Sequence, residues 1–287
     1  MLELSTLQLQ QLDFIGLQTL VKWAEKEGWN PGPYDAAVFW ATDPAGFVGY
    51  YIDGELIAGG SIVSYAERFG FMGFFIVKPE FRSQGIGNKL WMERRNRLLS
   101  RLKPEAAIGM DGVVTMQDFY RKGGFETAFR DERYERKGEK FELEQQLSRI
   151  DSKDFPEILT YDAACFGLER PQFLKPWLEM PQSHAFKYVE NGFIKGFSVL
   201  RKAGVGYKIG PLFADNLQAA EALYKACLNA VSGKAVFLDI PVNNPFTLAL
   251  VKKYRATYVF ECARMYHGKP PKQALDKIFG VTTFELG

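Results

Sequence analysis

Apolar residues recur at helical spacing near the start of the chain. From Leu7 to Lys26 they fall three or four residues apart, and the pattern ends before Gly28, so it predicts one amphipathic helix. Short apolar runs bounded by turn residues then predict three strands, at 46–52, 56–65 and 70–77.

The rest of the first half alternates between helices and strands. The pattern predicts a helix at 87–102, a strand at 106–110, a short helix at 115–122 and a last strand at 125–134. Three or four antiparallel strands followed by this alternation predict an α+β fold, a mixed α/β sheet with helices on its faces.

The hairpin pattern of the first half occurs again in the second. Segments 51–63 and 188–200 both place β-prone residues around an Asp-Gly or Asn-Gly turn, and several of their residues match at one constant offset. Other pairs match in the same order, for example 108–113 with 236–241. We therefore predict two related domains in tandem, 1–138 and 139–287.

One segment joins a strand to a helix through a glycine loop. Pro79 stops the strand that ends at Val77, and Gly85 and Gly87 allow a close backbone approach. The first N–H groups of a helix lack internal partners and carry the positive end of the dipole, so they suit a pyrophosphate. Arg82 adds a cation beside them.

Other readings of this loop fail on spacing. A dinucleotide fingerprint needs a third glycine at position 90, which is Leu90, and the Walker pattern of glycine, lysine and serine or threonine is absent. A tight turn that binds nothing is the remaining alternative.

Two motifs resemble those of a known superfamily. Arg82, Gly85 and Gly87 stand at the fixed positions of the pattern R/Q-x-x-G-x-G/A, and residues 119–125 read Phe-Tyr-Arg-Lys-Gly-Gly-Phe. Both segments resemble the GNAT superfamily of N-acetyltransferases, the first its acetyl-coenzyme A signature and the second its F-Y-x-x-x-G-F segment. The chain also looks like the bacterial YitH-like group over nearly its whole length, down to the ending 284–287.

The resemblance implies how acetyl-coenzyme A binds. The strand before the loop splays from its neighbour, so its main chain pairs with pantetheine and the loop N–H groups hold the pyrophosphate. The implied coenzyme residues are Ile76, Val77, Arg82, Ser83, Gln84, Gly85, Ile86, Gly87 and Asn88. The same strand is expected to offer an N–H to the thioester oxygen.

The resemblance also implies a catalytic acid. Tyr120 stands where many members place a tyrosine near the coenzyme sulfur, and it is expected to protonate the departing thiolate. An aromatic core residue on an amphipathic helix is the alternative for Tyr120. Many relatives carry a glutamate base before the loop, where this chain has Gly73 and two phenylalanines. A water relay or a base from elsewhere remains, and Asp111 is the first candidate for such a base, with capping of the next turn as its alternative role.

The acceptor site is less marked in the sequence. Trp29 and Asp35, in and after a proline-rich loop, are candidates for binding the acceptor, with Asp35 holding a cationic amine; an ordinary surface aspartate is the alternative. The second half lacks the glycine pair and the arginine, and Asp215 there would repel a phosphate. We expect no coenzyme in the second half, which instead forms one wall of the acceptor pocket.

Composition narrows the function further. A net charge of +2 is too small to predict nucleic-acid binding, and a solvated helix face explains the arginines at 94–101. Three scattered cysteines and two histidines predict no metal site and no disulfide framework. Neither a membrane span nor a signal peptide is expected, which favours the cytoplasm.

The sequence therefore predicts an acyltransferase enzyme that moves acetyl from acetyl-coenzyme A to a primary amine of a small molecule by direct transfer. A protein lysine or N-terminus as acceptor, a non-catalytic acyl-coenzyme A sensor, and a structural pairing module remain as alternatives.

Overall fold

The computed structural model describes residues 4–287. Its α-helices are α1 Phe14–Lys26, α2 Asp35–Thr42, α3 Ile86–Leu99, α4 Gln117–Lys122, α5 Phe155–Phe166, α6 Pro171–Leu178, α7 Leu217–Ala230 and α8 Pro245–Lys253. The strands of the first half are β1 Gln10–Gln11, β2 Phe47–Ile52, β3 Glu55–Ser61, β4 Val63–Tyr65, β5 Phe69–Phe71, β6 Ile76–Val77, β7 Ala107–Val113 and β8 Glu126–Lys137. Those of the second half are β9 Leu147–Arg149, β10 His184–Glu190, β11 Phe193–Lys202, β12 Tyr207–Ala214, β13 Ala235–Pro241, β14 Thr257–His267 and β15 Ile278–Gly280.

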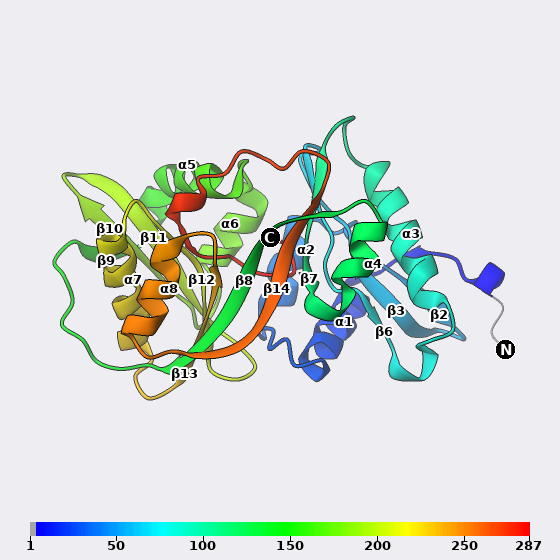
Figure 1. The fold of residues 1–287 in the computed structure, drawn as a ribbon, viewed down its shortest axis with the longest axis horizontal. Helices are drawn as coiled ribbons and strands as arrows, with labels where there is room; N and C mark the ends of the chain where they lie inside the picture. Colours follow the sequence, from blue (N-terminus) through cyan, green and yellow to red (C-terminus); the bar gives the residue numbers. More distant parts are fainter. Residues whose placement is uncertain (1–3) are drawn as a thin grey trace.

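The strands form two sheets, which confirms the α+β fold. One has the order β1-β2-β3-β6, and the other runs β4-β5-β7-β14-β8-β13-β12-β11-β10-β9, with β15 paired to β12. Two long strands cross between the halves, because β14 lies between β7 and β8, and β8 lies between β14 and β13 (Figure 1). The halves thus exchange their last strands, and the predicted boundary after residue 138 falls just past β8 within a continuous sheet.

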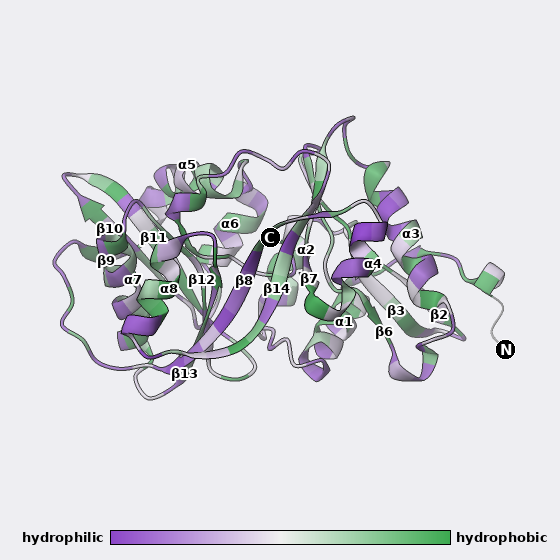
Figure 2. Cartoon of the chain, in the orientation of Figure 1, coloured by the Kyte–Doolittle hydropathy of each residue, from purple (hydrophilic) through white to green (hydrophobic). Residues whose placement is uncertain are grey.

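The two long central strands carry charged residues into the middle of the molecule. Figure 2 shows much of β8 as hydrophilic, although it is paired on both edges. Asp131 and Arg133 of this strand are buried, as is Arg264 of β14. The junction between the halves is therefore rich in buried charge.

Two predicted strands are divided between the sheets. The predicted strand at 56–65 is β3 in one sheet and β4 in the other, and the strand at 70–77 is β5 and β6. Phe74 lies between β5 and β6 with a φ of 48°, so the chain turns sharply there. As a result β6 diverges from β7, which is the splay that the resemblance implied.

The predicted helix at Leu7–Lys26 begins later than expected. Asp13 caps α1 by accepting a 2.8 Å hydrogen bond from the Gly16 N–H, so the helix starts at Phe14. Residues before it form β1, which pairs with β2. Leu12 is buried in the core, as the apolar pattern predicts, but it lies in this extended segment and not in the helix.

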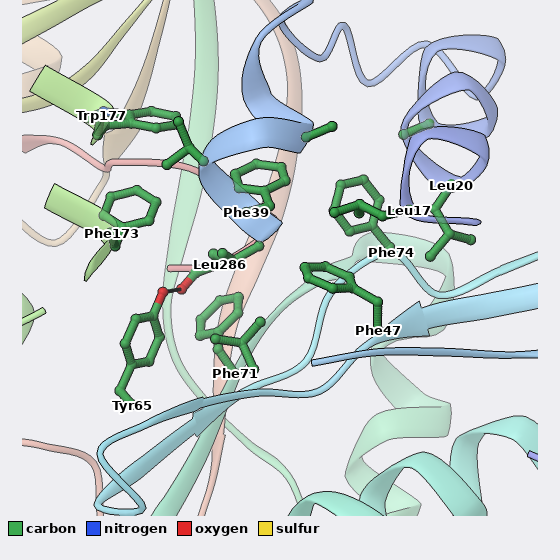
Figure 3. Packing of buried hydrophobic residues seen from close by; sticks show 14 of the residues in the cluster. Leu17, Leu20, Phe39, Phe47, Tyr65, Phe71, Phe74, Phe173, Trp177 and Leu286 are labelled. Atoms are coloured by element: carbon green, nitrogen blue, oxygen red, sulfur yellow. Dashed lines mark hydrogen bonds between the residues drawn. The ribbon is translucent and has the colours of Figure 1, made fainter. Parts of the chain in front are cut away.

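The segment 278–287, here called the C-terminal segment, passes between the halves. β15 pairs with Leu212 and Phe213 of β12, and the Val281 N–H donates to the Asp239 carbonyl of β13. The segment therefore fills the gap between β12 and β13. Figure 3 shows its Leu286 packed among aromatic rings, where its carbonyl accepts from the Tyr65 hydroxyl at 2.8 Å.

None of the helices within residues 4–287 is long and apolar enough to cross a membrane.

Candidate active site

A cavity of about 550 Å³ opens where β6 and β7 diverge. The first half contributes both strands, the glycine loop and α4, while β14 and the C-terminal segment close the cavity from the second half. The residues that line it include Trp29, Met72, Gly73, Phe75, Ile76, Val77, Arg82, Ser83, Gly87, Asn88, Met110, Asp111, Met116, Phe119, Tyr120, Arg133, Phe260, Cys262, Phe284 and Glu285. A site of this size with apolar walls and few polar groups is typical of a small-molecule or cofactor site.

One end of the cavity has the features of a phosphate cradle. Gly85 precedes α3 in the left-handed conformation, with φ 84°, and no side chain caps the helix. Gly87 lines the cavity, and a Cβ there would sit 3.7 Å from the Phe75 ring, in the space of the cradle. The N–H groups at the start of α3 are thus left for an outside anion, and the residues fit a coenzyme pyrophosphate.

The predicted coenzyme residues divide into two groups. Ile76, Val77, Arg82, Ser83, Gly87 and Asn88 line the cavity. Gln84, Gly85 and Ile86 are not among the lining residues: Gln84 donates to the Glu80 carbonyl, and the Ile86 side chain is fully buried beneath the loop. Any contribution from these three comes through the backbone.

The β6 strand has a free edge for pantetheine. Within residues 4–287 its sheet partner is β3, on one side only. Arg82 donates to the Val77 carbonyl at 2.8 Å and forms an ion pair with Glu27. Arg82 therefore fixes the end of β6. Its positive charge, which was predicted to bind phosphate, is partly offset by Glu27.

Tyr120 lies at the wall of the cavity, on α4. Its ring packs 4.9 Å from that of Trp91 and close to Phe75, and the residue is only 4% exposed. Burial raises the pKa of Tyr120 to about 12, so the hydroxyl keeps its proton at neutral pH. A protonated phenol next to the coenzyme channel can donate to a leaving sulfur.

The strand turn at Gly73 is held from behind by Arg94. The Arg94 guanidinium donates to the carbonyls of Ser61 and Gly73, at 2.6 and 2.7 Å, and the Ser61 hydroxyl accepts from the Gly73 N–H. Arg94 is fully buried, so the solvated helix face expected for this arginine is wrong. Burial lowers its pKa to about 10, which still leaves a cation beneath the site at neutral pH.

Asp111, the predicted base, lies inside β7 and lines the cavity. Arg264 occupies both of its carboxylate oxygens, at 2.7 and 2.9 Å. The guanidinium engages both oxygens of this carboxylate and opposes its protonation, so the geometry argues against Asp111 as the base and assigns it to the support of β14.

Asp35 does not reach the cavity, which corrects its predicted role. It is fully buried, lies 3.0 Å from Arg201 of β11, and accepts from the Gly32 N–H at 2.8 Å. This ion pair joins α2 to the second half. It is neither the expected amine ligand nor a surface aspartate.

Trp29 does line the cavity, as predicted for an acceptor residue. Its carbonyl accepts from Arg133 at 3.2 Å and from Lys208 at 2.9 Å. Burial lowers the pKa of Lys208 to about 7, with the nearby Arg133 charge acting in the same direction. The loop at Trp29 is thus fixed by two basic side chains of the central sheet.

The sequence missed the lining residues that come from the second half. Phe260 and Phe284 pack against each other and against the Arg133 guanidinium, which lies 4.7 and 5.4 Å from their ring centroids. Glu285 follows Phe284 and is buried, with 4% exposure. In the sequence, residues 284–287 contributed only to the family resemblance and did not indicate a role in the site.

Within residues 4–287, no group of three or more histidine, cysteine or acidic residues could hold a metal ion. The buried Asp131 has no hydrogen-bond partner for either oxygen, and burial raises its pKa well above the usual range. It stands beside Cys262 on the neighbouring strand but does not line the cavity.

Two family models match the chain, one in each half. A model described as "Acetyltransferase (GNAT) family" matches residues 14–125, and one described as "Acetyltransferase (GNAT) domain" matches residues 158–280. The first match contains the glycine loop and α4, and the second contains β12 and α7.

Individual proteins are similar over most of the chain. Holothin acyltransferase of Pseudoalteromonas sp. (strain SANK 73390) is 28% identical over 272 residues, 94% of this chain and 91% of its own. The uncharacterized N-acetyltransferase YitH of Bacillus subtilis (strain 168) is 22% identical over 201 residues, 68% of each chain. A crystal structure from Pyrococcus horikoshii has a TM-score of 0.83 at 20% identity, and the match covers 100% of this chain and 98% of that one.

Proposed function

The chain belongs to the GNAT superfamily and is an acyltransferase with two such domains in tandem; from this premise we propose that its first half transfers acetyl from acetyl-coenzyme A to a primary amine of a small molecule. The transfer is direct, without an acyl-enzyme intermediate. The observation that carries the proposal is the open cleft between β6 and β7, which leads from the uncapped start of α3 to Tyr120.

The residues of the first half have distinct tasks in this reaction. The α3 N–H groups bind the pyrophosphate, and the free edge of β6 aligns the pantetheine arm. The coenzyme supplies the acetyl group as a thioester. Backbone N–H groups near the start of β6 stabilise the oxyanion, and Tyr120 donates to the sulfur as it leaves.

A small acceptor is favoured by the form of the site. Residues from the second half close the acceptor end, and several aromatic and methionine side chains line the cavity. The similar protein named holothin acyltransferase, whose match spans nearly the whole chain, is also an acyltransferase by its name. The three cysteines are buried and form no disulfide, which is typical of a reducing compartment, so we place the reaction in the cytoplasm. We expect neither nucleic acid nor a membrane to take part.

A panel of acceptors tests the proposal. The purified protein is mixed with acetyl-coenzyme A and, in separate reactions, alkylamines, arylalkylamines, amino acids, diamines and lysine-containing peptides, and thiol release is followed. Turnover above the no-amine rate with small amines supports the proposal. Preference for peptides would make the acceptor a protein, and tight coenzyme binding with no turnover would make the protein a sensor.

A further inference from the structure

The C-terminal segment crosses the point where β5 gives way to β6. The Glu285 carbonyl lies so close to Gly73 that a Cβ on Gly73 would stand 2.3 Å from it. Any larger residue at position 73 would push the segment away. The absence of a side chain at Gly73 therefore lets Glu285 enter the cavity beside the strand that leads to the coenzyme.

Glu285 is the unneutralised carboxylate of the cavity wall. Three acidic residues line the cavity, and two of them are paired, Glu27 with Arg82 and Asp111 with Arg264. Glu285 has no ion pair within 4.0 Å among residues 4–287. Its carboxylate accepts from the neighbouring Thr283 hydroxyl, which fixes the side chain and leaves capacity for another donor.

The surroundings favour a cationic partner for this carboxylate. The charges of Arg133 and Lys208 both interact with that of Glu285. Asp239 binds Arg133 through two hydrogen bonds, at 2.6 and 2.7 Å, and the lowered pKa of Lys208, about 7, leaves that amine partly uncharged at neutral pH. Arg133 is therefore already paired with Asp239, and Glu285 has no cation of its own within 4.0 Å in the described part of the chain.

The segment that carries Glu285 is held firmly on both sides. Before it, β15 is paired with β12, and after it the Leu286 carbonyl accepts from Tyr65 (Figure 3). The Gly287 carbonyl accepts from the buried Arg170 at 2.8 Å. A group fixed in this way needs little reorganisation when substrate binds.

We propose that Glu285 binds the acceptor ammonium group and takes its proton. The C-terminal segment of the second half thus supplies the base for the reaction in the first half, and this role rests on the proposed amine acetylation. One ammonium proton passes to the Glu285 carboxylate. The nitrogen lone pair forms a bond to the thioester carbon, and the carbon–sulfur bond breaks with its electrons on sulfur. Tyr120 gives its proton to the sulfur and recovers the second proton lost by nitrogen, while Glu285 releases its proton to solvent.

Glu285→Gln tests the role with almost no change of shape. With the best amine of the acceptor panel, kcat/KM is expected to fall about 100-fold or more, as for loss of a general base. Coenzyme A affinity, measured by calorimetry, should stay within about twofold, because the pyrophosphate site is untouched. Glu261→Gln is the matched control: this carboxylate on β14 pairs with the exposed Arg130 and lies outside the cavity lining, so its rate should be that of the wild type.

A second variant covers the case in which Glu285→Gln does not fold. Glu285→Asp keeps the charge but retracts the carboxylate by one methylene, and an intermediate loss of about tenfold is expected. Wild-type rates in either variant, or an equal loss in Glu261→Gln, would overturn the role of Glu285 while leaving the acetylation intact. Failure of the wild type on every amine would remove the proposed function, and the role of Glu285 with it.

Discussion

The two halves contain the same cleft, but only one of the two clefts is open. In the first half β5 pairs in parallel with β7 at 69–71 and 107–109, and in the second half β12 pairs in parallel with β13 at 207–209 and 236–238. Beyond these residues both strand pairs diverge. A cavity lies between the diverging strands of the first half, whereas β15 fills the gap in the second.

The helix that follows each cleft repeats the contrast. Gly85 leaves the first turn of α3 without a side-chain cap, while Asn216 caps α7 by accepting from the Ala219 N–H at 2.9 Å. A capped N-terminus has less need of an outside anion. In the second half a side chain of the protein therefore binds an N–H group at the start of α7, whereas in the first half the N–H groups at the start of α3 are left for a ligand.

The two halves also differ in one side chain of the helix that precedes the last strand, α4 before β8 and α8 before β14. The Phe125 N–H donates to the Tyr120 carbonyl at 3.1 Å, and the Ala256 N–H donates to the Val251 carbonyl at 3.0 Å. Tyr120 and Val251 thus hold matching positions in matching turns. Only the first has a hydroxyl, so the shared fold sets the positions, and individual residues decide which half can perform chemistry.

The largest expected effect comes from blocking the open cleft. Gly87→Trp would place an indole in the phosphate cradle, so coenzyme A affinity should fall at least about 1000-fold, roughly 4 kcal/mol. Isothermal titration calorimetry measures the loss. Gln218→Trp, at the matching exposed position of α7, is the control and should bind coenzyme A as the wild type does. Equal losses in both variants would show that the halves do not differ as described.

Removal of the phenol should separate binding from chemistry. Tyr120→Phe is expected to lower turnover about 100-fold, because the departing sulfur loses its proton donor, with coenzyme A affinity nearly unchanged. Thiol release at saturating acetyl-coenzyme A reports the rate. The control is Tyr254→Phe, at the end of α8 in the second half, which should have the wild-type rate. A wild-type rate for Tyr120→Phe would show that Tyr120 is not the acid.

The packing of the filled cleft can be disturbed at a residue that does not line the open one. A Cβ on Gly210 would lie 2.3 Å from the Thr282 carbonyl, a backbone atom of the C-terminal segment, so the segment has to move. Gly210→Ala should lower the free energy of unfolding by about 1–3 kcal/mol. Urea denaturation measures this change, and unaltered stability would mean that the segment is not tightly packed between β12 and β13.

The smallest effect concerns the cap of α7. Asn216→Ala removes the side-chain acceptor, and the protein should lose about 1 kcal/mol of stability. Coenzyme A titration of the same variant should give one site with the affinity of the wild type. A second coenzyme site in this variant would show that the cap alone excludes the ligand from the second half.

Much of this contrast can be read from the sequence because it is local. The glycine loop, the capping asparagine and the Phe-Tyr segment are each defined by a few adjacent residues, and the hairpin repeat follows from turn residues at fixed spacing. Their places in the structure follow from backbone rules for helix ends and turns. The missed α2 at Asp35–Thr42 is short and apolar on most sides, so it has little periodicity to detect.

The parts that could not be predicted depend on contacts between distant residues. Nothing in the local sequence shows that the strand at 257–267 lies between β7 and β8. The same holds for Asp35, whose partner Arg201 is far along the chain, and for Glu285, which reaches the cavity only because β15 is fixed in the other half. The division of 70–77 into two strands follows from the turn at Phe74, and the adjacent Gly73 does not by itself show that the chain leaves one sheet for the other.

The central claim, one open coenzyme site and one filled from within, is tested most directly by the stoichiometry of coenzyme A binding. Calorimetric titration of the wild-type protein should give one coenzyme per chain, and Gly87→Trp should reduce this to none. Two coenzymes per chain, or one that persists in Gly87→Trp with unchanged affinity, would contradict the account.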